Sequence, residues 1–103
     1  MNTAPLGVPP SCPYALTQVA VGSAPGGVWL DAVLTCDGEP VARVVQRGDG
    51  GPDIIRPLTR DGWEAVSAYE AYAATWGAQH GIRHEPADAL TAELLAAWAD
   101  GQR

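Results

Sequence analysis

The chain has 103 residues, of which 47% are hydrophobic, and its formal net charge at pH 7 is −6. This length suits one domain, and the hydrophobic content is typical of a globular protein. The acidic balance disfavours binding to nucleic acid or to a membrane surface, because both favour a surplus of Lys and Arg. We therefore expect no nucleic-acid partner and no membrane partner.

Residues 1–13 hold four of the nine prolines and show no periodic pattern, which predicts an irregular arm before a single domain over residues 14–103. The sequence has neither the basic and apolar segments of a secretion signal nor a run of about 20 apolar residues that would cross a bilayer. We therefore expect a cytoplasmic protein in which Cys12 and Cys36 are reduced.

Three strand signals follow the arm. Residues 14–21 predict a first strand, and residues 28–36 and 41–47 predict a hairpin around Asp37-Gly38, a dipeptide typical of two-residue turns. This turn pairs Leu34 with Val41 and Leu30 with Val45. The predicted core face then holds Leu30, Leu34, Val41 and Val45, and the second face holds a half-polar set: Trp29, Asp31, Val33, Ala42, Val44 and Gln46.

A glycine-rich turn at residues 48–52 separates the hairpin from a short strand at residues 53–58. This strand is expected at a sheet edge, because Pro57 cannot donate to a ladder of hydrogen bonds. Asp49, Gly50, Gly51 and Asp53 form a candidate loop site for a small ligand or a cation. Their spacing matches no phosphate-binding or calcium-binding loop, and a plain β-turn is the alternative that we favour.

Two helices are predicted after this strand. The first begins near Thr59, with Asp61 and Glu64 as a capping box, and ends at His80-Gly81. The second covers residues 87–100. Strands first and helices second predict an α+β fold, with an antiparallel sheet of three to four strands followed by two helices packed on one face. The expected apolar positions of the helices are Trp63, Val66, Tyr69, Ala73, Trp76, Leu90, Leu94, Leu95 and Trp98.

Side chains with metal-binding or catalytic potential are few. Cys12, Cys36, His80 and His84 are the ligand types of a zinc site, but Gly81 separates the histidines and the cysteines lack the close spacing of a zinc finger. An alternative is a small enzyme that uses Cys36 and His84, but no local sequence signature supports it. We expect no metal, no cofactor and no catalytic residue.

Trp29 and Tyr72 are the aromatic residues that the predicted core leaves uncovered. Trp and Tyr are common where proteins bind one another. We therefore expect a non-enzymatic protein-binding module, with Trp29, Asp31, Val33, Val44 and Tyr72 as contact residues. The partner is another protein or a second copy of the chain in a homodimer; a metal- or ligand-binding domain is the alternative function.

The hairpin, the GDGG turn and the helix that follows resemble small uncharacterised α+β proteins of actinobacteria and their phages. The resemblance covers residues 28–76, rests on the pattern V-x-x-x-G-D-G-G and implies no named family. A short acidic chain with Arg as its sole strongly basic residue type is typical of GC-rich genomes and their mobile elements. One form of the hypothesis is therefore a phage or mobile-element accessory protein that inhibits a host defence enzyme by occupying its surface.

Overall fold

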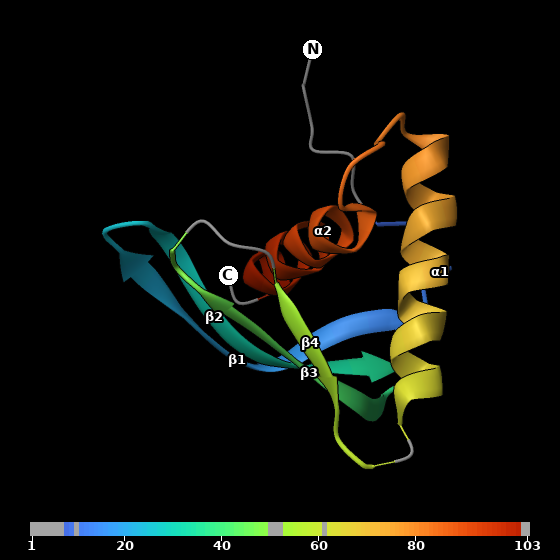
Figure 1. The fold of residues 1–103 in the computed structure, drawn as a ribbon, viewed down its shortest axis with the longest axis horizontal. Coiled ribbons are helices and arrows are strands. Elements are labelled where there is room, and N and C mark those ends of the chain that lie inside the picture. The colour runs from blue at the N-terminus through green and yellow to red at the C-terminus, as the bar shows by residue number, and fades with distance from the viewer. Residues whose placement is uncertain (1–7, 10, 50–52, 61, 102–103) are drawn as a thin grey trace.

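A four-stranded antiparallel sheet followed by two helices forms the fold, which confirms the α+β prediction (Figure 1). The computed structural model describes residues 8–9, 11–49, 53–60 and 62–101. The strands lie in sequence order, so that β1 and β4 are the two edges. The elements are β1 (Tyr14–Ala24), β2 (Gly27–Cys36), β3 (Glu39–Arg47), β4 (Ile54–Pro57), α1 (Trp63–Gln79) and α2 (Pro86–Gly101).

The turn between β2 and β3 forms at Asp37-Gly38, as predicted. Both residues have positive φ, 52° for Asp37 and 83° for Gly38, which is the backbone of a type I′ turn. Cys36 therefore pairs with Glu39, as the two-residue loop requires. The predicted edge position of the last strand is also confirmed by β4.

The register of β3 changes immediately after this turn. Thr35 pairs with Pro40, but Leu34 pairs with Ala42, so Val41 is an extra residue in β3. Proline has no N–H to donate to the ladder, and such a residue is commonly accommodated at a β-bulge. The predicted pairing of Leu34 with Val41 is therefore wrong.

Because side chains alternate between the faces of a strand, the bulge exchanges the two faces of β3 beyond it. Ala42 and Val44 are fully buried on the face that packs against the helices, whereas Val45 is half-buried on the other face. The sequence prediction had placed Val45 in the core and Val44 outside it. Both assignments are wrong for the same reason.

Both helices pack on one face of the sheet, which we call the inner face. Helix α1 contacts β3 and β4, and α2 contacts β1, while the helices also contact each other. The hydroxyl groups of Tyr69 in α1 and Thr91 in α2 are joined by a buried hydrogen bond of 2.7 Å. The apolar core comprises Tyr14, Leu16, Leu30, Ala32, Leu34, Ala42, Val44, Val66, Tyr69, Ala73, Trp76, Leu90 and Leu94.

The first turn of α1 differs from the prediction. The helix begins at Trp63, with Gly62 at its N-cap and no side-chain cap, so it starts later than expected. Asp61, the first residue of the predicted capping box, lies outside the described residues. Trp63 is 58% exposed, and its predicted place in the core is wrong.

The C-terminal end of α1 follows the prediction. Gly81 has a φ of 73°, and the N–H of Ile82 donates to the carbonyl oxygen of Gly77 at 2.8 Å. This is the hydrogen bond that closes a helix of the Schellman type, for which glycine supplies the left-handed backbone. Among the described residues, neither helix is long and apolar enough to span a membrane.

Candidate functional site

The face of the sheet opposite the helices carries the side chains that alternate with the core positions of β2, β3 and β4. We call it the outer face. Trp29, Asp31 and Val33 lie on it, as predicted, and the register places Val45 and Ile54 in the same row as Asp31. Val33, Val45 and Ile54 are half-buried, so an apolar strip crosses the middle of this face.

Trp29 is the largest side chain of the outer face and is 38% exposed. It pairs with Gly22 on β1, where an added Cβ atom would lie 2.6 Å from the indole Nε1. The indole therefore occupies the space above Gly22, an arrangement in which an aromatic ring covers the backbone that a glycine leaves bare. This contact holds the ring against the sheet while part of it remains accessible.

An ion pair joins two neighbouring strands on this face. The Arg43 guanidinium donates to both carboxylate oxygens of Asp31, with Nε 2.9 Å from Oδ1. The hydrogen bonds from Arg43 lower the pKa of the Asp31 carboxyl. Both side chains are largely exposed, so the pair orients the guanidinium more than it stabilises the fold.

The outer face also concentrates positive charge in an acidic protein. Arg43 pairs across the ladder with Arg56 on β4, and Arg47 pairs with Trp29 on β2. Half of the six Arg residues of the chain therefore lie here, with Asp31 between them. By contrast, the acidic residues Glu64, Glu70, Asp88, Glu93 and Asp100 belong to the two helices on the inner side.

Two residues of the predicted contact set lie elsewhere. Val44 is 0% exposed on the inner face and cannot contact a partner, because of the bulge in β3. Tyr72 is half-buried on α1, and its ring meets that of Tyr14 edge-on at a centroid distance of 5.3 Å. Five further residues of the outer face were not assigned to it from the sequence: Arg43, Val45, Arg47, Ile54 and Arg56. For the three that lie on β3, the signal in the sequence is Pro40, because a proline in a strand commonly lies at a β-bulge.

The structure describes two of the four residues of the predicted loop site, Asp49 and Asp53. Asp49 is exposed, and Gly50 and Gly51 lie outside the described residues. Asp53 instead faces Asp88 on α2, and its backbone N–H donates to Asp88 Oδ2 at 3.4 Å. Burial, followed by repulsion from Asp88 and Glu85, raises the pKa of Asp53 to about 6.

Asp53 and Asp88 line a cavity of about 380 Å³ between the β2–β3 ladder and α2. Burial also raises the pKa of Asp88. Leu30, Leu95 and Thr91 supply the neighbouring walls, so the two carboxyl groups lie in largely apolar surroundings. This accounts for the raised pKa values, because an apolar environment disfavours ionised groups.

The remaining candidates for chemistry lie apart from the outer face. Cys12 and Cys36 are both free thiols, and His80 packs against Trp76 at a ring-centroid distance of 5.2 Å. His84 is exposed in the connection between the helices. Across the part of the chain that the structure describes, no three His, Cys, Asp or Glu residues form a group suited to a metal ion.

Comparison of the chain with known proteins gives no further guide to the site. No model of a protein family, no curated protein and no solved structure matches it. The functional argument therefore depends on the surfaces described above.

Proposed function

We propose that this protein is a binding module without catalytic activity, which docks the outer face of its sheet onto an acidic surface of a partner protein. The observation that carries the proposal is the composition of this face. It combines an accessible indole and an apolar strip with three Arg residues, in a chain whose net charge is −6. The proposed contact residues are Trp29, Asp31, Val33, Arg43, Val45, Arg47, Ile54 and Arg56.

Each part of this surface has a physical role in binding. Trp and Arg are the residue types most often found at the energetic centre of protein interfaces, because they bury a large area and also form polar contacts. The indole of Trp29 is already held over Gly22, so little side-chain entropy is lost when a partner covers it. The Arg residues would speed encounter with an acidic surface and set its orientation.

The positive charges of the three Arg residues argue against a homodimer that forms through the outer face. A two-fold interface brings the same patch of both copies together. Arg43, Arg47 and Arg56 of one copy would then face those of the other, with one Asp31 in each copy as compensation. We therefore favour a different, acidic protein as the partner, which includes the case of a host enzyme that is blocked when its surface is occupied.

The test begins with capture of a binding partner by this protein from a lysate of the encoding organism, followed by identification and purification of that partner. The dissociation constant of the complex is then measured with the wild type, with Arg47→Glu on the outer face and with Arg83→Glu in the exposed connection between the helices. Both variants change the net charge equally. We expect Arg47→Glu to weaken binding by about tenfold or more, and Arg83→Glu to leave it nearly unchanged.

Three results would overturn the proposal: equal losses in both variants, a concentration-dependent homodimer that Trp29→Asp converts to a folded monomer, or tight binding of single-stranded DNA or RNA oligonucleotides. The last would mean that the indole and the Arg residues serve base stacking and phosphate contacts instead.

A further inference from the structure

The cavity between the β2–β3 ladder and α2 combines apolar walls with one polar region. Val28, Leu30 and Leu95 contribute apolar side chains, and Val28 remains 46% exposed, so this wall can be reached from solvent. Asp53 and Asp88 supply the carboxyl groups of the polar region. Pockets for small organic molecules have this composition and volumes of about 300–1,000 Å³. At about 380 Å³, the cavity suits a ligand at the small end of this range.

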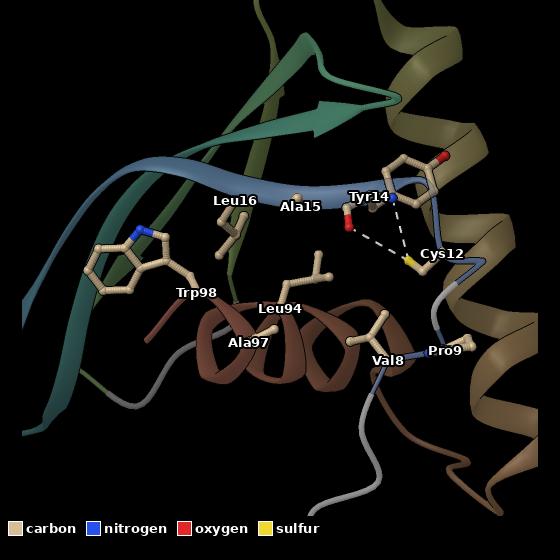
Figure 2. A pocket seen from close by; sticks show the side chains of 9 residues that line it. All are labelled: Val8, Pro9, Cys12, Tyr14, Ala15, Leu16, Leu94, Ala97 and Trp98. Atoms are coloured by element: carbon tan, nitrogen blue, oxygen red, sulfur yellow. Dashed lines mark hydrogen bonds between the residues drawn. The ribbon is translucent and has the colours of Figure 1, made fainter. Parts of the chain in front are cut away.

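A second hollow, the groove between β1 and α2, differs from this cavity in its chemistry. The groove has a volume of about 270 Å³, and Figure 2 shows Leu16 facing Leu94 and Trp98 across it. All the described residues that line it are uncharged, and the Cys12 thiol beside it accepts a hydrogen bond from the Tyr14 backbone N–H. The groove therefore has no charged group that could orient a polar ligand, whereas the cavity has two.

The two carboxyl groups of the cavity lack a compensating positive charge. They lie close enough to repel each other, since the backbone N–H of Asp53 donates to Asp88 Oδ2 at 3.4 Å, and Glu85 adds a further negative charge. Within the described part of the chain, no ion pair joins Asp53 or Asp88 to a basic side chain. Like charges in apolar surroundings destabilise a fold, and such groups in a cleft are common at functional sites.

We propose that this cavity binds a small organic molecule that carries a primary ammonium group on an apolar body. The ammonium group would lie between Asp53 and Asp88, and the apolar body would contact Leu30 and Leu95. A primary ammonium group has three N–H donors. Gln46 also lines the cavity, and its amide oxygen is available as a third acceptor.

A metal ion or an anion suits the cavity less well. Ca²⁺ takes about 6–8 oxygen ligands, and among the described residues no three His, Cys, Asp or Glu side chains form a group that could hold a metal ion. The apolar walls would contribute nothing to a hydrated ion, whereas they can bury the body of an organic amine. Asp53 and Asp88 would repel an anion. The cavity is separate from the outer face, so the inference does not depend on the function proposed above.

The test is a titration of the protein with three primary amines at pH 7, followed by methyl NMR. The amines are hexylamine, cyclohexylmethylamine and 2-phenylethylamine, each compared with the alcohol of the same carbon skeleton, which carries no charge. We expect an amine to shift the methyl signals of Leu30 and Leu95 in the cavity and to leave those of Leu16 in the groove unchanged. The matching alcohol should bind about tenfold or more weakly.

Two pairs of variants separate the role of the charge from that of the walls. Asp53→Asn removes one carboxylate of the cavity, and Glu70→Gln removes an equal charge from the exposed side of α1. Ala92→Leu fills part of the cavity, and Ala96→Leu adds the same atoms to α2 outside it. We expect Asp53→Asn and Ala92→Leu to weaken amine binding by about tenfold or more, and the two controls to change it little. Leu is a good helix former, so α2 should remain folded.

The pH dependence of binding reports on the Asp53 carboxylate directly. The groups that face it are Asp88 and Glu85, both acidic, and the phenol of Tyr69, which burial keeps neutral by raising its pKa. The pKa of Asp53 is about 6, so lowering the pH from 7 to 5 neutralises most of this carboxylate while the amine stays protonated. The affinity should therefore fall about tenfold, and less in Asp53→Asn.

Several results would overturn the proposal. They are no binding of any of the three amines, equal affinity for each amine and its alcohol, or equal losses in the variants and their controls. Binding that strengthens as the pH falls would do the same, as would binding of Ca²⁺ or Mg²⁺ with the same dependence on Asp53. None of these measurements involves the outer face, so they leave the function proposed for that face to its own test.

Discussion

The inner and outer faces of the sheet are built from alternating residues of the same strands, yet they have opposite surroundings. Leu34 and Val44 on the inner face are 0% exposed beneath the helices, whereas Trp29 on the outer face is 38% exposed. The acidic residues of α1 and α2 lie on the inner side, and three Arg residues lie on the outer side. One inserted residue, Val41, determines which half of β3 faces the helices and which half faces a partner.

The largest effect that would test this comparison is expected when neighbouring valines of β3 are replaced one at a time by alanine. We expect Val44→Ala to lower the free energy of unfolding by about 2–3 kcal/mol, because it removes buried methyl groups and leaves a cavity. Val45→Ala removes the same atoms from the half-buried outer face, and we expect a loss of less than about 1 kcal/mol. Chemical denaturation of both variants provides the measurement. A larger loss for Val45→Ala than for Val44→Ala would contradict the bulge and support the register in which Val45 faces the helices.

The two hydrogen bonds of the Thr91 hydroxyl, one to Tyr69 in α1 and one within α2, provide a second test of the inner side. Thr91 Oγ1 donates to the Ala87 carbonyl oxygen at 2.9 Å, so the Tyr69 hydroxyl must donate to Thr91. Thr91→Val leaves a buried phenol without its acceptor and should cost about 2 kcal/mol. Tyr69→Phe leaves the bond from Thr91 to Ala87 intact and should cost about 1 kcal/mol. Urea unfolding of both variants tests this order, and the reverse order would contradict the assigned donor.

A smaller effect is expected at the acidic pair beside α2. The pKa of Asp53 is raised to about 6 in the folded protein, above its ordinary value of 3.8. The protonated form therefore favours folding: its contribution is complete below about pH 4 and is lost as the pH rises through about 6. At pH 7 the ionised carboxylate is destabilising.

Asp53→Asn should therefore stabilise the protein at pH 7, by about 1 kcal/mol after allowance for solvent screening, and much less at pH 4. The substitution leaves the hydrogen bond from the backbone N–H of residue 53 to Asp88 Oδ2 in place, because this bond does not use the Asp53 side chain. Thermal unfolding at both pH values measures the difference, with Glu70→Gln on the exposed side of α1 as the control. A gain that is equal at the two pH values would contradict the raised pKa.

Local signals in the sequence predicted most of the elements. Asp37-Gly38 identified the turn, Gly81 identified the end of α1, and Pro57 identified an edge strand. The start of α1 was predicted too early, because its N-cap is Gly62 without a side-chain hydrogen bond. The start therefore has no capping side chain that the sequence could reveal.

The outer face was predicted in part. Side chains alternate regularly between the two faces along β2, whereas the bulge interrupts this alternation along β3. Trp29, Asp31 and Val33 precede the turn and were assigned correctly to this face, but Val44 follows the bulge and was not. The pairing of Asp53 with Asp88 joins residues 35 positions apart. The contact between Asp53 and Asp88 and the groove between β1 and α2 both depend on how the helices pack on the sheet. For this reason no local sequence pattern predicts either of them.

The most direct test of the outer face as the binding site is methyl NMR of the wild-type protein, titrated with the purified partner. Val33, Val45 and Ile54 report on the outer face, and Leu16 and Leu94 report on the groove beside β1. We predict that the methyl shifts of Val33, Val45 and Ile54 change first and most. Changes confined to Leu16 and Leu94 would contradict the account and assign the partner to the β1 edge.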